Sequence, residues 1–363
     1  MASREHNYEV SHYSKSNVRS RLIDSLKGCI LCCYLLCPPV PDAITRKLAF
    51  HPPLKGSYSI KLLDNGSDTT VSRASQLVGK TFRIYPKQRS RTSPSDYDAI
   101  TRRVECFVLR TSRKNYIIAI KCSPSDVPLE ETLRELVVLF SQPNASDLGE
   151  YLQPLHMNVP MLADLLGTDV YAYDYSGYGM STGKPSEKNI YADIRAVYSH
   201  VRQTQPNKKI VLLGYSLGTA VASDLAASAP DGLTGVVLVA PFTSGLRLFR
   251  EQPTLEKSSR IDRFTTIDKV KHIKVPLLVC HGCRDEAIPY EHGTEIEKKA
   301  LRPVQAFLLP EADHMSIFNG KYLQPFQRIR FFLSDETELG LQRKSRSKSS
   351  QQKTGSAPSG QTK

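Results

Sequence analysis

Short runs of Val, Leu and Ile alternate with stretches of helical character from about residue 101 onward. Most of these runs are continuously apolar, as strands covered on both faces require. Such alternation predicts an α/β domain with a mostly parallel, eight-stranded sheet and helices on both faces. Ligands of such sheets bind beyond the carboxyl ends of the strands. The predicted strands are Val104–Leu109, Tyr116–Lys121, Leu136–Phe140, Asp169–Tyr173, Lys209–Leu213, Val236–Ala240, Pro276–Cys280 and Gln305–Leu309.

Four segments between and after these strands predict helices. One carries a single apolar stripe behind Pro185-Ser186, a pair that marks a helix start. The stripe consists of Ile190, Ile194, Val197 and Val201. The other three are an alanine-rich helix over Leu217–Ala229, a charged and exposed helix over Glu291–Ala300, and a closing helix over Met315–Leu333.

The strand over residues 209–213 leads directly into Gly214-Tyr215-Ser216-Leu217-Gly218 and then into the alanine-rich helix. This G-x-S-x-G pattern between a strand and a helix is typical of a sharp turn that presents a serine at the edge of a sheet. The glycines permit the turn without side-chain collisions, and the helix start supplies backbone N–H groups and a positive dipole end. The pattern therefore predicts Ser216 as a nucleophile, with a plain structural turn as the alternative.

A serine hydroxyl needs a base, and the base needs a carboxylate to orient it. In this architecture they follow in the order serine, acid, histidine. Asp285 comes after the strand over residues 276–280, and His314 comes after the strand over residues 305–309. We therefore expect Asp285 as the acid and His314 as the base. The rivals are Glu286 and Asp313 for the acid, and His281 and His292 for the base.

The rival histidines are less well placed. His281 is expected to lie too close to the strand end, and His292 falls in the helix predicted to be exposed. Cys280-His281-Gly282-Cys283 offers crowded ligands at a strand end, which favours packing over a zinc site. The predicted chemistry needs no metal and no organic cofactor.

An oxyanion hole needs two N–H donors. The backbone N–H of Leu217, directly after the nucleophile, is the first candidate. The second comes from the loop after the strand over residues 136–140, which reads Ser141-Gln142-Pro143-Asn144-Ala145. In this loop the backbone N–H of Asn144 is the candidate donor.

The chain ends carry most of the net charge of +13. Residues 1–61 hold 9 Lys/Arg against 4 Asp/Glu, and residues 342–363 hold 6 against none, whereas the segment between them holds 34 against 32. A nucleic-acid-binding domain would carry a basic face on its folded part, so the pattern argues against nucleic acid and for an anionic membrane surface. No apolar run approaches the roughly 20 residues of a membrane-spanning helix.

These shifts in composition suggest four parts. Residues 1–61 form a basic, cysteine-rich segment, and polar, turn-rich residues 62–100 predict a poorly structured connector. The α/β domain is expected over residues 101–338. Residues 339–363 predict a basic, disordered tail.

Four cysteines lie together in the first part, at Cys29, Cys32, Cys33 and Cys37. A signal peptide would begin its apolar region unusually late here and lacks a small-x-small cleavage site. A zinc site would be crowded and without a second ligand pair. Several acyl chains beside basic residues hold a protein stably at a membrane, so multiple S-acylation is favoured. A short buried apolar segment is the alternative.

Several motifs together resemble the α/β-hydrolase domain-containing 17 family, whose members are membrane-tethered serine hydrolases that remove palmitate from cysteines of other proteins. The resemblance covers roughly residues 29–55 and 101–335. It implies an α/β-hydrolase fold with Ser216 as nucleophile, Asp285 as acid and His314 as base, and it implies that the cysteine cluster is an acylated anchor. The motifs are the cysteine cluster, Arg46–Phe50, Asp174–Gly179, Ser186–Ile194, Gly214–Thr219, and Asp285 with His314.

The resemblance also implies a substrate and a place in the cell. The expected activity is hydrolysis of S-palmitoyl or other long-chain acyl thioesters on S-acylated membrane proteins, by a monomer at the cytoplasmic face of the plasma membrane or endosomes. The oxyanion loop departs from the family, because Gln142-Pro143 stands where the family has His-Gly. Proline supplies no N–H and fixes φ, and losing one oxyanion donor costs about 10²–10³ in kcat. A carboxylester or lipid hydrolase with the same triad, or a weakly active membrane scaffold, are the alternatives.

Overall fold

The computed structural model describes residues 49–53, 56–63, 71–88, 93–125, 130–154, 157–254 and 257–345. The chain divides into two compact units, Met1–Phe50 and His51–Lys363, and the second contains the sheets. The predicted acylation sites Cys29, Cys32, Cys33 and Cys37 and the tail beyond residue 345 lie outside the described residues.

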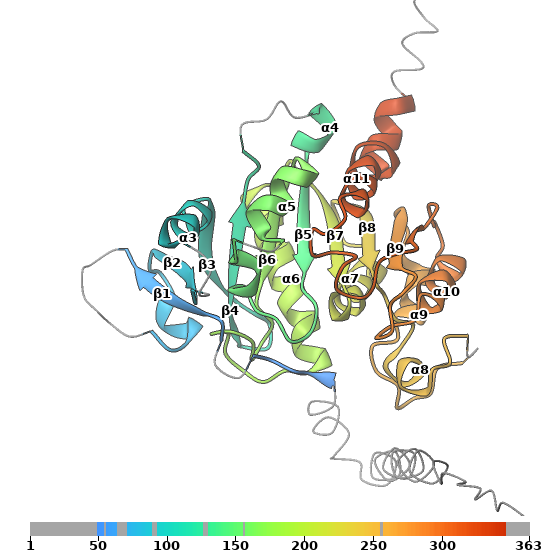
Figure 1. Ribbon diagram of the computed structural model, residues 1–363, viewed down its shortest axis with the longest axis horizontal. Coiled ribbons are helices and arrows are strands. Elements are labelled where there is room, and N and C mark those ends of the chain that lie inside the picture. Colours follow the sequence, from blue (N-terminus) through green and yellow to red (C-terminus); the bar gives the residue numbers. More distant parts are fainter. Residues whose placement is uncertain are drawn as a thin grey trace, which may run out of the picture. The chain divides into compact units, whose positions relative to one another are not determined.

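Eight strands form the main sheet in the order β10-β9-β8-β7-β5-β6-β4-β3, which runs across Figure 1. β4 is antiparallel to β3 and β6, and all other neighbours are parallel. The predicted mostly parallel, eight-stranded sheet is confirmed. The strands are β3 (Val104–Arg110), β4 (Tyr116–Cys122), β5 (Leu136–Ser141), β6 (Asp169–Tyr173), β7 (Lys209–Tyr215), β8 (Leu233–Val239), β9 (Leu277–Gly282) and β10 (Phe307–Leu309).

Helices cover both faces of this sheet, because its central strands are apolar on both sides. Val138 and Phe140 of β5 share a core with α5 (Val159–Leu166) and α11 (Gln324–Phe331). Their neighbours Val137 and Leu139 are equally buried and point to the opposite face, since side chains alternate along a strand. α6 (Glu187–Thr204) and α7 (Leu217–Ala227) contact β5 there.

Local signals set the ends of these helices. Ser186 caps α6 by accepting a hydrogen bond from the backbone N–H of Asn189, as the sequence predicts. α5 begins after Asn158, which caps it in the same way, and ends at Gly167 with a φ of 69°. The left-handed backbone conformation at this position favours glycine.

The sheet changes winding direction at β5. From β5 the chain passes to β6 on one side, whereas β7 lies on the other side. Ser141 at the end of β5 is in register with Gly214 of β7. The loop after β5 and the turn after β7 therefore leave the sheet side by side, at the place where such folds bind ligands.

The prediction of a poorly structured connector over residues 62–100 is wrong for the described part of that segment. β1 (Tyr58–Leu62) and β2 (Phe82–Pro86) form a two-stranded antiparallel sheet, followed by α3 (Pro94–Thr101). Phe82 and Ile84 face the core at every second position, whereas polar side chains occupy the outward positions. Their polarity lowers the average hydropathy of the segment and hides the strand.

The closing helix also differs from its prediction over residues 315–333. Residues 315–323 form turns, and α11 begins only at Gln324, with Pro325 in its first turn. Proline is tolerated there because its missing N–H has no partner in a first turn. The helix continues into one π-helical turn, η4 (Phe332–Glu336).

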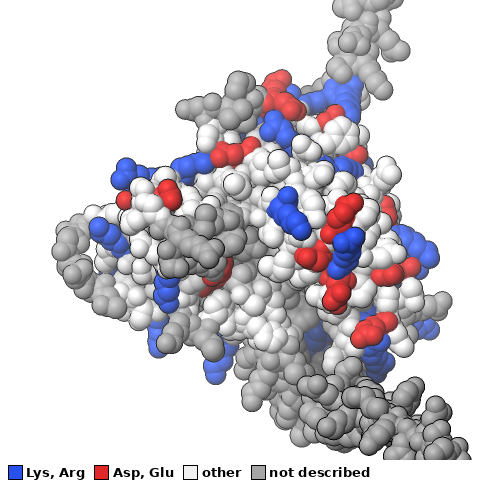
Figure 2. Space-filling model, viewed as in Figure 1, with Lys and Arg blue, Asp and Glu red and all other residues white. Residues whose placement is uncertain are grey.

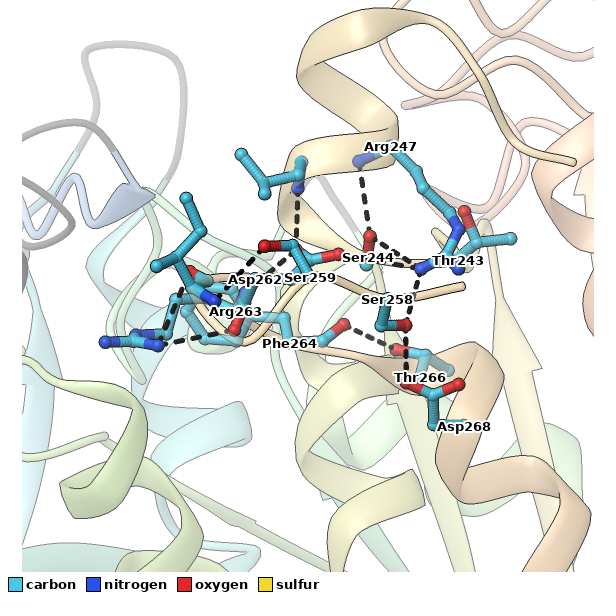
Figure 3. A network of polar contacts seen from close by, with 12 residues as sticks. Thr243, Ser244, Arg247, Ser258, Ser259, Asp262, Arg263, Phe264, Thr266 and Asp268 are labelled. Atoms are coloured by element: carbon cyan, nitrogen blue, oxygen red, sulfur yellow. Dashed lines mark hydrogen bonds and ion pairs between the residues drawn. The ribbon is translucent and has the colours of Figure 1, made fainter. Parts of the chain in front are cut away.

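The segment between β8 and β9 is built around a buried arginine. The Arg247 guanidinium donates to the hydroxyls of Ser244 and Ser258 and lies 3.5 Å from the carboxylate of Asp262. Figure 3 shows this network, in which Ser258 also donates to Asp268. A buried charge of this kind requires such partners. The segment contains α8 (Gly245–Arg250), α9 (Thr266–Lys269) and η3 (Val270–His272).

Further described helices are η1 (Ala74–Leu77), α4 (Glu131–Arg134), η2 (Glu150–Leu152) and α10 (Glu291–Lys299). Residues 338–345 are helical as well, so the prediction of a disordered tail over residues 339–363 is wrong for its described part. On the face seen in Figure 2, basic and acidic side chains are interspersed, most densely toward the right of the view. Among the described helices, none has the length and apolar character needed to cross a membrane.

Candidate active site

Ser216 occupies a strained turn between β7 and α7. Its backbone angles are φ 52° and ψ −115°, a region that residues other than glycine seldom adopt. The turn is held on both sides, because the Ser216 N–H donates to the Val239 carbonyl and the Ser216 carbonyl accepts from the hydroxyl and the N–H of Thr219. Strain of this kind persists only where the surroundings impose it, and it concentrates at functional sites.

The two glycines of the motif bring α7 against the end of β5. A methyl group on Gly218 would collide with the carbonyl oxygen of Ser141, and one on Gly214 would collide with the carbonyl of Gly218. Both residues are therefore required by the close approach of backbones. As a result, the loop after β5 lies directly beside the start of α7.

Asp285 and His314 meet where the chain leaves β9 and β10. The N–H groups of Cys283 and Arg284 donate to the carbonyls of Leu309 and Ala312, which joins the two loops. Nδ1 of His314 lies 2.7 Å from Oδ2 of Asp285, so the fold brings together two residues that are 29 positions apart.

The Asp285 carboxylate is held as an anion. Its Oδ1 accepts from the backbone N–H groups of Ala287 and Ile288, at 3.0 and 2.7 Å. Burial raises the pKa of the Asp285 carboxyl, but hydrogen bonds from His281 and His314 outweigh burial and hold the pKa well below its ordinary value. The group is therefore ionised at neutral pH and accepts the Nδ1 proton of His314.

Tyr215 links this pair to the nucleophile turn. Its hydroxyl donates to the backbone carbonyl of His314 at 2.6 Å, and its ring lies 5.6 Å from the His314 ring. Tyr215 directly precedes Ser216, whose hydroxyl has no hydrogen-bond partner among the described residues. The structure thus joins His314 and Asp285 directly and connects them to Ser216 through Tyr215. In unliganded hydrolases, catalytic hydrogen bonds often form only when substrate is bound.

The rival acids and bases have other surroundings. Glu286 is exposed, and the exposed Asp313 accepts backbone N–H groups of its own loop. The expectation of an exposed His292 is wrong, because its side chain is buried between α10 and Thr243, to whose N–H and hydroxyl its Nδ1 is hydrogen-bonded. Burial, with His281 and Arg247 nearby, lowers the pKa of His292 to about 4.

Three tyrosines, one at the end of β6 and two in the segment after it, hold the candidate oxyanion loop. The hydroxyl of Tyr173 is hydrogen-bonded to Ser141, that of Tyr175 donates to the Gln142 carbonyl at 2.6 Å, and that of Tyr178 donates to the Asn144 side chain at 2.7 Å. The rings stack edge to face, with centroids 5.5 Å apart in each successive pair. The loop containing Pro143 is therefore fixed from one side by a rigid aromatic column.

A buried carboxyl supports the same loop from below. Asp174 accepts from the Leu148 N–H, the Gln142 side chain and the hydroxyl of Tyr58, which lies in β1. Burial, and next the charge of Asp147, raise the pKa of Asp174 to about 8. The sequence places Asp174 in a recognisable motif but does not reveal this role, nor that residues of β1 contribute to it.

Of the candidate oxyanion residues, Leu217 is the first residue of α7, and Asn144 is fixed through its side chain to Tyr178 and to the N–H of His51. The sequence also gave no indication that His281 contacts Asp285, since a strand residue and a loop residue four positions on carry no recognisable pattern. A nucleophile turn, an imidazole–carboxylate pair and a braced loop at one sheet edge make up the parts of an acyl-transfer site.

The fold and this site define a serine hydrolase of the α/β-hydrolase class. A family model described as serine aminopeptidase, S33 matches residues 161–260. The esterase Pf2001 of Pyrococcus furiosus superposes with a TM-score of 0.51 at 16% identity, covering 70% of this chain and 96% of the esterase. The acylaminoacyl peptidase of Pyrococcus horikoshii superposes with a TM-score of 0.50 at 12% identity, covering 71% of this chain and 46% of the peptidase. At these identities the likeness concerns the fold.

Sequence relatives narrow the class to one family. The alpha/beta hydrolase domain-containing protein 17B of Homo sapiens is 34% identical over 311 residues, which cover 84% of this chain and 96% of the relative. The alpha/beta hydrolase domain-containing protein aho-3 of Caenorhabditis elegans is 36% identical over 309 residues, covering 84% of this chain and 82% of the relative. The chain belongs to the alpha/beta hydrolase domain-containing protein 17 family, and the resemblance inferred from its motifs is confirmed.

Proposed function

We propose that this protein hydrolyses S-palmitoyl and other long-chain acyl thioesters on cysteines of membrane-associated proteins, with Ser216, His314 and Asp285 as its catalytic triad. The observation that carries the triad is the 2.7 Å contact between His314 Nδ1 and Asp285, set beside the strained turn at Ser216. A carboxylate can only accept a hydrogen bond, so Nδ1 carries the proton and Nε2 is free to act as a base.

Each step of the proposed reaction has a group to perform it. Ser216 Oγ attacks the acyl carbonyl while Nε2 of His314 takes its proton, and Asp285 stabilises the resulting imidazolium. The backbone N–H groups of Leu217 and Asn144 are the proposed donors to the oxyanion. The tetrahedral intermediate expels the cysteine sulfur, which takes the proton from His314. Water, deprotonated by His314, then hydrolyses the acyl-serine and releases the fatty acid.

Two considerations support a thioester substrate. Membership of the family and the motifs of the sequence both favour a thioester substrate. In addition, a thiolate with a pKa of about 8.5 is a far better leaving group than an amine, so a thioester reacts readily even where oxyanion stabilisation is modest. An oxyanion loop that contains Pro143 in place of glycine is compatible with a substrate that needs only modest oxyanion stabilisation.

The place of action is part of the proposal. Acyl chains on Cys29, Cys32, Cys33 and Cys37, with the basic ends of the chain, would hold the protein at the cytoplasmic face of a membrane, where its acylated substrates are also confined. Confinement to one surface raises the effective concentration of the two partners. The protein would act there as a monomer.

The nucleophile is tested by labelling with a fluorophosphonate, which reacts with activated serines. Wild-type protein should be labelled and Ser216→Ala should not, because the probe forms its bond with Oγ of that residue. Ser228→Ala, at the end of the same helix, is the matched control and should label like wild type. Undiminished labelling of a folded Ser216→Ala protein would contradict the assignment.

The substrate class is tested separately, with a palmitoyl-thioester peptide and a monoacylglycerol assayed side by side. We expect kcat/KM to be higher for the thioester, since the thiolate leaves more readily. The reverse order would identify the protein as a lipid hydrolase with the same triad.

The anchor is tested by replacing Cys29, Cys32, Cys33 and Cys37 with serine. In fractionated cells the variant should move from the membrane pellet to the supernatant, because hydroxyl groups do not form the acyl thioesters that we propose. Replacing Cys106 and Cys122 in the folded domain provides the control and should leave the distribution unchanged. Persistence of the fourfold variant on membranes would refute acyl anchoring.

A further inference from the structure

A second histidine contacts the carboxylate of the proposed triad. His281 is the fifth residue of β9, and its side chain is completely buried. Its Nε2 lies 2.9 Å from the carbonyl oxygen of Ile288 and 3.3 Å from Oδ2 of Asp285. The Asp285 oxygen that faces His314 is thus also the one nearest to His281.

These contacts determine where the proton of His281 resides. Both neighbouring oxygens are acceptors, so Nε2 carries the proton: it donates to the Ile288 carbonyl and lies within ion-pair distance of Oδ2 of Asp285. Nδ1 of His281 is buried and has no hydrogen-bond partner within the described chain. A proton on Nδ1 would leave a buried donor without an acceptor, at considerable cost. His281 is therefore a neutral imidazole protonated on Nε2.

The His281 ring is also fixed in position. α10 passes so close to it that a methyl group on Gly293 would come within 2.6 Å of Nδ1 and within 3.2 Å of Val279. The imidazole is therefore enclosed between its own strand and the backbone of α10. It can neither turn toward solvent nor reach a substrate, whereas the side chain of His314 is 20% exposed.

We infer that His281 is a positioning residue that holds Asp285 in the orientation required by His314. The inference rests on the proposed triad. Oδ1 of Asp285 is occupied by two backbone N–H groups, and Oδ2 receives one imidazole from each side. Without His281, the only side chain in contact with Oδ2 would be His314, which is the residue that Asp285 has to orient.

The donor also determines how strongly Asp285 attracts the proton of His314. A hydrogen bond to a carboxylate stabilises its charge and makes it a weaker proton acceptor. Removing the Nε2–H group of His281 should therefore strengthen the hold of Asp285 on the His314 imidazolium. The base would then become neutral only at higher pH. Other titratable groups that interact with Asp285 include His292 of α10 and Tyr215 of β7. The exposed Arg284 and Glu286 adjoin it in the chain.

The first test is the pH profile of kcat/KM with a p-nitrophenyl ester, for His281→Leu and His281→Gln. Loss of a hydrogen bond to a charged group should lower kcat/KM of His281→Leu about 10- to 100-fold and move its acidic limb to higher pH. The side-chain amide of glutamine places a donor near the position of Nε2, so His281→Gln should recover most of the loss.

A buried histidine that does not touch Asp285 serves as the matched control. His292→Leu removes an equally buried imidazole from α10 and should lower thermal stability, while the acidic limb stays in place. Folded His281→Leu with an unchanged limb and less than a twofold loss would overturn the inference. So would an equal shift in both variants, because it would reflect loosened packing alone.

A measurement on the unaltered protein remains decisive if His281→Leu does not fold. The ¹⁵N chemical shifts of the His281 ring should report a protonated Nε2 and a bare Nδ1. A proton on Nδ1 would overturn the inference, since Nε2 could then not donate to Asp285. This readout is independent of activity and of labelling at Ser216, so failure of the proposed function and failure of this inference are distinguishable.

Discussion

At the scale of single residues, the site depends on side chains that have no freedom to choose another partner. Asp285 receives hydrogen bonds on both oxygens, and Tyr215 fixes the backbone of His314 rather than its ring nitrogens. Nε2 of His314 is thereby left for the reaction. Backbone hydrogen bonds hold Ser216 in its strained turn. Its hydroxyl therefore takes no part in maintaining the turn.

Asp285→Asn provides a test of this arrangement. The amide of asparagine can donate to Nδ1 of His314, which favours the tautomer with its proton on Nε2 and removes the base. We expect kcat to fall by about 10⁴, the loss known for this change in a serine triad. The assay is hydrolysis of a p-nitrophenyl ester near neutral pH.

The neighbouring carboxylate provides the control for that substitution. Glu286 is exposed and directly follows Asp285, so Glu286→Gln makes the same change of charge beside the site. It should retain near-wild-type activity. Comparable losses in the two variants would show that local charge, rather than the contact with His314, matters.

At the scale of elements, the loop after β5 depends on the segment after β6. The hydroxyls of Tyr173, Tyr175 and Tyr178 contact successive parts of the loop, and Asp174 between them binds the Gln142 side chain. The segment can do this because β5 and β6 are parallel neighbours that end at the same edge. The two loops therefore form one unit around the place of the proposed oxyanion.

Tyr175→Phe should weaken that unit. The variant leaves the ring packing intact but deprives the buried Gln142 carbonyl of the hydroxyl 2.6 Å away. An unsatisfied buried carbonyl costs about 1–3 kcal/mol, and we expect the loop to shift to recover a partner. The kcat for ester hydrolysis should fall by about 10-fold, with a smaller change in KM.

Tyr198→Phe removes a similar hydroxyl far from this loop. Tyr198 donates to the backbone carbonyl of Asp231 at 2.8 Å. Its loss should lower stability to a similar extent but leave kcat in place. If both variants lose the same activity, the contact with Gln142 has no special role.

The sequence predicts some elements better than others for physical reasons. All eight strands of the main sheet are found, and the central ones stand out most clearly, because strands covered on both faces are continuously apolar. The sequence does not reveal β2, because only alternate residues, such as Phe82 and Ile84, face the core. It predicts too early a start for α11, because residues 315–323 contain apolar side chains that pack from turns rather than from a helix.

The same holds for the site. The order and spacing of motifs predict the pairing of Asp285 with His314, since parallel strands bring their following loops together. The burial of His292 is not predictable, because a charged helix gives no sign that one of its residues faces inward. The contact of Tyr58 with Asp174 spans 116 positions, and no local pattern encodes a pairing between such distant polar residues.

At the scale of the whole folded unit, β1 and the loops of the main sheet are joined through buried carboxyl groups. Tyr58 donates to Asp174, and the Ser57 N–H donates to Asp147 at 2.7 Å. Asp193 of α6 accepts from the N–H and hydroxyl of Ser176 in the segment after β6. Burial raises the pKa of Asp193 to about 7, and burial followed by the charge of Asp147 raises that of Asp174 to about 8.

These raised pKa values predict how the stability of the protein depends on pH. The ordinary pKa of an aspartate is about 3.9, so up to about pH 8 the folded protein binds protons that the unfolded chain releases. The stabilisation from protonated Asp174 is therefore complete at low pH and is lost as the pH rises through about 8. Between pH 7 and pH 8 the free energy of unfolding should fall by about 1 kcal/mol through Asp174, whereas Asp193, whose pKa is about 7, contributes less.

Urea unfolding at pH 7 and pH 8 measures this difference, and Asp174→Asn should reduce it because the amide does not titrate. The pKa of His292, lowered to about 4, affects stability only below about pH 6.5, the ordinary pKa of histidine, and the depressed pKa of Asp285 affects it only at acidic pH.

The control is Asp164→Asn. Burial raises the pKa of Asp164, but hydrogen bonds from Arg103 and Ser125 outweigh burial and lower it, so this group is ionised in the folded and the unfolded protein at pH 7 and pH 8. Equal pH dependence in wild type and Asp174→Asn would show that Asp174 is already ionised in the folded protein at pH 7.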